Sequence, residues 1–282
     1  MVIVLTVLSA LCWSAFDVSR KALVRDTPPI PLAAAFAWAQ APVFFIWAAV
    51  TATASLPGVD YGWPGLAVLA LNAGASIGFF AALRRGELSR TVPLLSLSPV
   101  FSAILGALVL DEWLETQQWL GVALVVGGAL LLAWPRTPAQ REGSAVGAAL
   151  MVVTAALWAG TAVFDKVALQ HSTMAMHAGL QTLALAAVLT TGLAATGRAQ
   201  EMRSVRHRRA AFLAGVLVST VALALQLEAV QLIAVGMMES IKRATGMVAA
   251  VALGRLFFGE ALSVGKWLAV AVMAAGVWLV VS

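Results

Sequence analysis

Ten apolar runs dominate this sequence, and each is about as long as a helix that crosses a lipid bilayer. A hydrocarbon core of about 30 Å needs about 20 apolar residues in a helix. Lipid offers the backbone no hydrogen-bond partner, so a helix must satisfy its own N–H and C=O groups. We therefore predict an all-α membrane protein with ten transmembrane helices. They cover residues 2–23, 31–54, 64–83, 91–110, 117–134, 145–168, 174–196, 210–230, 234–258 and 264–281.

Composition agrees with a lipid environment and excludes several classes of protein. The chain is 61% hydrophobic and 11% charged, and its mean hydropathy is +0.93. A water-soluble domain of this composition would expose a very large apolar surface. The net charge of +5 comes from basic residues between the apolar runs, which argues against a nucleic-acid partner. Cys12 is the only cysteine, so we expect no internal disulfide and no thiolate metal site.

Basic residues are unevenly distributed among the loops between the predicted helices. They follow the first, third, fifth and seventh helices, as at Arg25, Arg84, Arg136 and Arg203. The loops after the second, fourth and eighth helices contain none. The positive-inside rule therefore predicts cytoplasmic odd-numbered loops and both termini outside, in a bacterial inner membrane.

Two patterns of the first half recur in the same order in the second half. Trp13 and Lys21 have the same spacing as Trp158 and Lys166. Further along, three residue pairs align in register: Glu112 with Glu260, Trp119 with Trp267, and Gly128 with Gly276. This order predicts a duplication, with five-helix repeats at residues 1–134 and 145–282.

A repeat with an odd number of helices has a direct topological consequence. The second copy must enter the membrane from the opposite side, which gives two inverted five-helix repeats. Such pairs are typical of secondary transporters, in which the substrate binds near the midplane between the repeats. The alternative interpretation is a membrane scaffold that was merely duplicated.

These motifs resemble those of the drug/metabolite transporter superfamily, in its ten-helix branch with two EamA domains. The resemblance covers nearly the whole chain and includes the stretch from Leu94 to Ser102 and the Gly-rich fifth and tenth helices. It implies metabolite export or exchange by alternating access without ATP. The chain has no Gly-rich phosphate loop followed by Lys-Ser or Lys-Thr. In the related small multidrug resistance proteins a Glu that binds proton and drug lies eight residues before the matching Lys, where this chain has Trp13 and Trp158.

Three charged residues lie close together near the start of the ninth predicted helix, at Glu239, Lys242 and Arg243. A central Lys or Arg costs about 2.5 to 3.5 kcal/mol on insertion scales. The spacing places both cations on the Glu239 side, so one ion pair forms and one cation is left over. We predict that Lys242 or Arg243 binds a carboxylate or phosphate, and such a pair also resembles that of organellar phosphate-sugar translocators. The alternative is that these residues form a structural ion pair and extend their charged groups to the membrane–water interface.

Other polar residues complete the candidate site. Asp17 lies at ion-pair spacing from Arg20 and Lys21 in the first predicted helix. The remaining candidates for lining a cavity are Trp13, Trp158, Asn72 and Gln226. An interhelical hydrogen bond explains the amides equally well.

Residues near helix ends have a structural or interfacial interpretation. Lys21 and Lys166 are predicted to anchor helix ends at the interface. Glu112 and Glu260 end their helices, where a carboxylate avoids most of the desolvation cost. The three histidines, His171, His177 and His207, show no metal spacing and are predicted to be solvated or to cap helices.

The sequence thus predicts a secondary transporter of a small amino-acid-like or carboxylate-bearing metabolite, which moves through a central cavity between the repeats. The alternative is a flippase for a lipid-linked anionic or phosphate-bearing substrate. We predict no enzymatic activity, because His-Glu-x-x-His and Gly-x-Ser-x-Gly motifs are missing from the sequence. We expect no cofactor and no metal. The expected partners are a small-molecule substrate and the lipid bilayer, a coupling ion is left open, and a monomer suffices.

Overall fold

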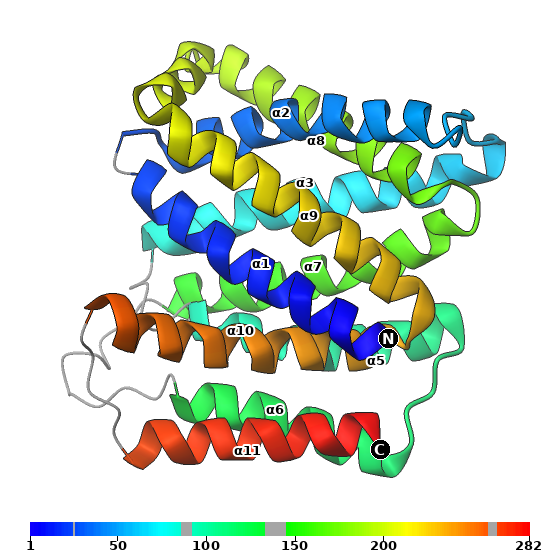
Figure 1. The fold of residues 1–282 in the computed structure, drawn as a ribbon, viewed down its shortest axis with the longest axis vertical. Helices are drawn as coiled ribbons and strands as arrows, with labels where there is room; N and C mark the ends of the chain where they lie inside the picture. Colours follow the sequence, from blue (N-terminus) through cyan, green and yellow to red (C-terminus); the bar gives the residue numbers. More distant parts are fainter. Residues whose placement is uncertain (25, 86–91, 133–144, 259–263) are drawn as a thin grey trace.

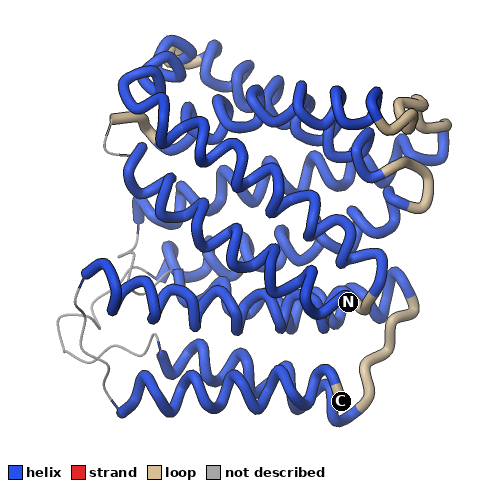
Figure 2. Tube along the Cα trace, viewed as in Figure 1, coloured by secondary structure: helices blue, strands red, loops and turns tan. Residues whose placement is uncertain are grey.

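The computed structural model describes residues 1–24, 26–85, 92–132, 145–258 and 264–282. Within these ranges the chain is helical and contains no strand (Figure 2). The α-helices are α1 (Val2–Leu23), α2 (Pro29–Val50), α3 (Gly62–Arg85), α5 (Ser98–Leu110), α6 (Thr116–Leu132), α7 (Ala145–Leu169), α8 (Met174–Ala195), α9 (Arg209–Leu232), α10 (Val235–Phe258) and α11 (Val264–Val281). Three 3-10 segments accompany them: η1 (Val59–Tyr61), η2 (Val92–Leu97) and η4 (Ala199–Arg208). The predicted all-α class is confirmed, and the described residues form ten α-helices where ten were predicted.

The fourth predicted helix, residues 91–110, differs from a single α-helix. It begins with the 3-10 segment η2, and α5 starts only at Ser98, with Pro99 in its first turn. Proline lacks a backbone N–H and its ring restricts the preceding residue, so it is well placed at the start of a helix and poorly placed inside one. Pro99 therefore marks a helix start rather than a kink within a longer helix.

Most helices have the length and composition of membrane spans. Six segments are long and apolar enough to cross a bilayer: Val2–Leu23, Pro29–Val50, Val59–Ala82, Ala145–Leu169, Met174–Ala195 and Ala199–Leu232. Three shorter apolar helices are Leu94–Leu110, Thr116–Leu131 and Trp267–Val281. The chain is therefore a multi-pass membrane protein. Helix α10 belongs to neither group and contains the charged residues Glu239, Lys242 and Arg243.

The principal helix contacts join the first half of the chain to the second. Helix α1 packs along α9, α3 along α7, α2 along α8, and α6 along α11 (Figure 1). Helix α5 lies against both α7 and α10, and α1 also contacts α10. The two halves are therefore interleaved and do not form separate bodies.

Helices α6 and α11 approach each other unusually closely. A Cβ at Gly121 would lie 2.6 Å from the backbone oxygen of Gly276, and a Cβ at Gly276 would lie 2.7 Å from that of Gly121. Both contacts are with backbone, which a side-chain rotation cannot relieve. Small residues at such crossings allow two membrane helices to pack backbone against backbone.

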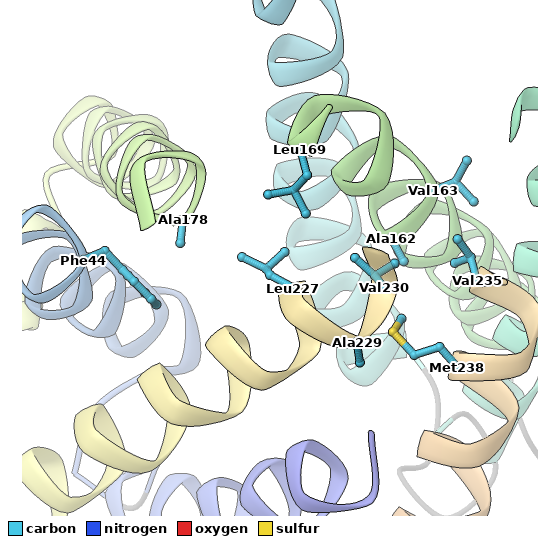
Figure 3. Close-up of a cluster of buried hydrophobic side chains, with 10 residues drawn as sticks. All are labelled: Phe44, Ala162, Val163, Leu169, Ala178, Leu227, Ala229, Val230, Val235 and Met238. Carbon is cyan, nitrogen blue, oxygen red and sulfur yellow. The ribbon is translucent and has the colours of Figure 1, made fainter. Parts of the chain in front are cut away.

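An apolar cluster fixes the start of α10 against its neighbours. Its buried members come from α2, α7, α8, α9 and α10 (Figure 3). Val235 and Met238 contribute from α10, Leu227 and Val230 from α9, and Val163 from α7. Because Met238 directly precedes Glu239, this packing positions the charged stretch of α10 inside the bundle.

Candidate functional site

Lys242 lies at the centre of a polar network that joins α1, α9 and α10. Its Nζ is 2.6 Å from Glu239 Oε1 and 2.8 Å from Gln226 Oε1. The same Gln226 oxygen accepts a hydrogen bond from Trp13 Nε1 at 3.0 Å. A carboxylate three residues before Lys242 and an amide from α9 thus satisfy its charge, as the spacing of Glu239 and Lys242 predicts.

Arg243 is the cation that Glu239 does not pair with at ion-pair distance. Its Nη2 donates to Ser98 Oγ at 3.1 Å, and Ser98 Oγ donates to Glu239 Oε2 at 3.3 Å. Among the described residues no carboxylate forms an ion pair with Arg243, and its buried Nε makes no hydrogen bond. A buried guanidinium N–H without a partner is costly, because the group has been desolvated without compensation.

Asp17 interacts electrostatically with Arg243 but forms no ion pair with it. The two charges interact. The carboxylate forms an ion pair with Arg20 one turn later at 3.3 Å, and Arg20 lies over the Phe16 ring at 5.5 Å. The Asp17 side chain is 69% exposed. Its charge therefore acts on the Arg243 guanidinium alongside that of Glu239.

Two predicted candidates lie apart from this network. Trp158 packs its ring against Phe79, with 5.5 Å between the centroids, inside an apolar cluster. Asn72 on α3 is half-buried, and its side-chain amide makes no hydrogen bond to another described residue. The structure brings together Trp13, Gln226, Glu239, Lys242 and Arg243.

Ser98 is a site residue that sequence reasoning missed. It is 3% exposed and lies in the first turn of α5, where it bridges Glu239 and Arg243. The stretch from Leu94 to Ser102 contributed to the family resemblance, but nothing local singles out this hydroxyl. Its two partners lie more than 140 residues away in sequence.

Glu112 and Lys166 form an ion pair, with 2.5 Å between Lys166 Nζ and Glu112 Oε1. Lys166 also donates to the backbone oxygen of Ile233 at 2.8 Å, and Glu112 Oε2 accepts from the Val235 backbone N–H at 2.8 Å. Lys166 thus reaches inward to a carboxylate and a helix end. Lys21 lies in the last turn of α1, and Glu260 lies outside the described residues.

The prediction for His177 is wrong, because this histidine is not solvated. It is 1% exposed and lies 3.0 Å from both Asp165 Oδ1 and the Tyr61 hydroxyl. Its neighbours come from α7 and η1, which local sequence does not reveal. His171 and His207 are exposed, as predicted. The described part of the chain contains no group of three residues that could hold a metal ion.

Known proteins share both the sequence pattern and the fold. An "Uncharacterized transporter in cobO 3'region" from Sinorhizobium sp is 49% identical over 72 residues, which is 25% of this chain and 51% of that protein. A "Probable 4-amino-4-deoxy-L-arabinose-phosphoundecaprenol flippase subunit ArnE" from Pseudomonas fluorescens is 39% identical over 72 residues, which is 26% of this chain and 62% of that protein. The matches thus span about half to three fifths of these relatives.

A solved structure described only as "Crystal structure of protein" aligns over 99% of this chain and 98% of its own, with a TM-score of 0.78 and 17% identity. At this identity the likeness establishes a common fold and nothing about substrate. The pattern of the EamA-like transporter family matches residues 1–134 and 145–282. The predicted drug/metabolite transporter resemblance is confirmed, and the chain belongs to the EamA-like transporter family.

Proposed function

We propose that this transporter binds the anionic group of a small metabolite at Arg243 and moves it by alternating access between two inverted repeats. The observation that carries this proposal is the unsatisfied guanidinium. Arg243 lies inside the bundle with a buried, unpaired Nε and with Ser98 as its hydrogen-bond partner. An intramembrane cation without a carboxylate at ion-pair distance is costly, so a ligand whose anionic group pairs with it gains affinity.

The chemistry of Arg243 suits a carboxylate or phosphate. A guanidinium presents its N–H donors as a planar fork, which two oxygens of one anionic group can accept together. Glu239 is already engaged by Lys242 and Ser98, so its charge is largely compensated. Asp17 is exposed and interacts with the Arg243 charge, and it can accept the ammonium group of an amino-acid-like substrate. A carboxylate-bearing metabolite is therefore our first candidate.

Contacts across the bundle support the inverted-repeat part of this proposal. In the sequence alignment of the two repeats, Gly121 corresponds to Ala269 and Gly128 corresponds to Gly276. A Cβ at Gly121 would lie 2.6 Å from Gly276 O, and a Cβ at Gly128 would lie 3.0 Å from Ala269 O. Exchange of the two repeats converts the first contact into the second. A two-fold relation between antiparallel α6 and α11 explains both contacts.

A lipid-linked anion is the second candidate substrate. Two probable ArnE flippase subunits from Pseudomonas fluorescens strains match this chain at 39% and 37% identity over 72 and 70 residues. Their name gives 4-amino-4-deoxy-L-arabinose-phosphoundecaprenol as the molecule that is flipped. A lipid phosphate presents the same kind of oxygen acceptors to Arg243 as a soluble carboxylate.

A flux assay in proteoliposomes separates the two substrate classes. One arm measures counterflow of labelled glutamate, malate and neutral amino acids, and the other measures flipping of a fluorescent polyprenyl phosphate. We expect flux of a soluble carboxylate to fall at least about tenfold in Arg243→Gln, because a charge-assisted hydrogen bond is lost. Arg243→Lys should retain part of the flux, since the positive charge remains but the planar pair of N–H donors is lost.

A matched control lies on η4, where Arg203 is exposed, and Arg203→Gln should transport normally. Full flux in Arg243→Gln would remove this residue from the binding site. Flipping of the polyprenyl phosphate without any soluble flux would favour the flippase.

A further inference from the structure

A second polar cluster, separate from the Arg243 network, lies where η1, α7 and α8 meet. His177 Nε2 is 3.0 Å from Asp165 Oδ1, and His177 Nδ1 is 3.0 Å from the Tyr61 hydroxyl. Gln181 Nε2 donates to the same hydroxyl at 3.0 Å and to Gly65 O at 2.9 Å. Asp165 is 5% exposed and His177 is 1% exposed. Four side chains thus form one buried chain of hydrogen bonds.

All of these hydrogen bonds are satisfied together when the imidazole is neutral. His177 Nε2–H then donates to the ionised Asp165, and Nδ1 accepts the hydroxyl proton of Tyr61. The Tyr61 oxygen accepts from Gln181. In this state the cluster carries one buried negative charge.

Addition of one proton changes the bonding pattern. An imidazolium donates from both nitrogens, so Nδ1–H must now point at the Tyr61 oxygen. Neither described hydrogen-bond partner of the Tyr61 hydroxyl then accepts its proton, because His177 Nδ1 carries a hydrogen and Gln181 presents an N–H. The Gln181 amide can offer its oxygen only by turning, which breaks its bond to Gly65 O. The proton therefore neutralises the buried charge and loosens Tyr61.

No other described charge near this end competes with Asp165 for the imidazole. Helices α2 and α8 contain no charged residue apart from His177 itself. The remaining ionisable groups of the elements around α8 are exposed, lie at the opposite helix ends or are paired elsewhere: Asp60, Arg84, Arg85, Lys166, His171, Arg198, Glu201, Arg203, Arg206, His207, Arg208, Arg209 and Glu228. Among the described residues, Asp165 is therefore the carboxylate that faces the imidazole of His177.

We propose that Asp165 and His177 form a proton-binding site, and that a proton bound there releases Tyr61 and opens the end of the bundle at η1 and α8. This assignment rests on the proposed transport function for its role, which is that of a coupling-ion site. Lys166 follows Asp165 directly on α7 and, through Glu112, is joined to the first residue of α10. A movement of the α7 end can therefore reach the helix that carries Arg243.

Imidazole NMR tests the proton site without any substrate. The chain has three histidines, so His171→Gln together with His207→Gln leaves only His177 in ¹⁵N-histidine-labelled protein. We expect one imidazole that titrates between about pH 4 and pH 8. Asp165→Asn should lower the titration midpoint by at least about one pH unit, because the carboxylate no longer stabilises the imidazolium. An imidazole that stays neutral throughout, or a midpoint that Asp165→Asn leaves unchanged, would overturn the assignment.

Distances between spin labels test the opening. Val59 on η1 is 95% exposed and Val188 on α8 is 41% exposed, so both accept a label in a Cys12→Ala background. We expect a longer distance to become populated from about pH 8 to about pH 5. His177→Gln should keep the short distance at every pH, since its amide can accept the Tyr61 proton and cannot be protonated. Tyr61→Phe removes the hydroxyl and should show the longer distance at every pH.

The same pH-dependent change in His177→Gln as in the unmodified chain would overturn the proposal, and so would an unchanged distance in the unmodified chain. Neither readout uses flux, so the outcome is separate from that of the transport proposal. Arg243→Gln should retain the full pH response. If the protein transports none of the tested solutes but shows the pH-dependent distance change, the proton site is supported and only the substrate assignment is refuted.

Discussion

Glu112 and Lys166 come from opposite halves of the chain and form an ion pair, with 2.5 Å between Oε1 and Nζ. Glu112 also accepts the N–H of Val235 at the start of α10, and Lys166 donates to the carbonyl of Ile233 just after α9. Helix ends leave such backbone groups without intrahelical partners. One charge pair therefore holds the α9–α10 turn against α7 and the end of α5.

Replacement of Glu112 with Gln should destabilise the fold by about 3 kcal/mol, since the remaining charge is left without its partner. Both side chains are about one sixth exposed, which favours the lower end of the usual range. Lys166→Met alone should have a similar effect, and the double variant should recover part of the loss. Denaturant unfolding in detergent measures all three. Strictly additive losses would mean that the two residues do not act as a pair.

Lys242→Gln should lower stability more than it lowers substrate affinity. The change leaves the buried Glu239 with Ser98 as its described hydrogen-bond partner and removes the nearest positive charge. We expect a loss of about 2 to 3 kcal/mol, which Glu239→Gln in the same chain should reverse in part. Thermal melting of the single and double variants measures the effect. Normal melting of Lys242→Gln with abolished flux would instead place Lys242 at the substrate.

Gly121→Ala and Gly276→Ala should each separate α6 from α11. The added methyl group would lie within 2.7 Å of a backbone oxygen of the facing helix. Overpacking of this kind costs about 1 to 3 kcal/mol. Gly127→Ala on the same helix is the matched control, because a Cβ there meets no atom within 4 Å. Equal melting temperatures for all three variants would contradict the close approach.

The orientation of the chain is testable by cysteine labelling. We propose that η4 faces the cytoplasm of a bacterium and that both termini lie outside, on the basis of the basic loops. In a Cys12→Ala background, Ser55→Cys should react with an impermeant maleimide in intact cells and His207→Cys should react only after lysis. Both positions are exposed. The reverse pattern would invert the topology.

Local sequence determined the helices and the contacts within a helix. The lengths of the apolar runs predicted every described α-helix, with α5 shortened by the 3-10 turn before Pro99, but not the 3-10 segments η1 and η4. Residues three apart on one helix lie on the same face, so the pairs of Glu239 with Lys242 and of Asp17 with Arg20 follow from spacing alone. The surplus cation in α10 was predictable for the same reason.

Tertiary structure decided which faces meet. Trp13 and Gln226 are 213 residues apart, and Ser98 and Glu239 are 141 apart, so no local pattern relates them. The burial of His177 was equally hidden. In a soluble protein the apolar side of a helix indicates the core, but lipid is as apolar as leucine, so hydrophobicity does not distinguish a lipid-facing side from a buried one. Contacts between helices depend on the fit of side chains and small residues across the bundle, which only the folded chain specifies.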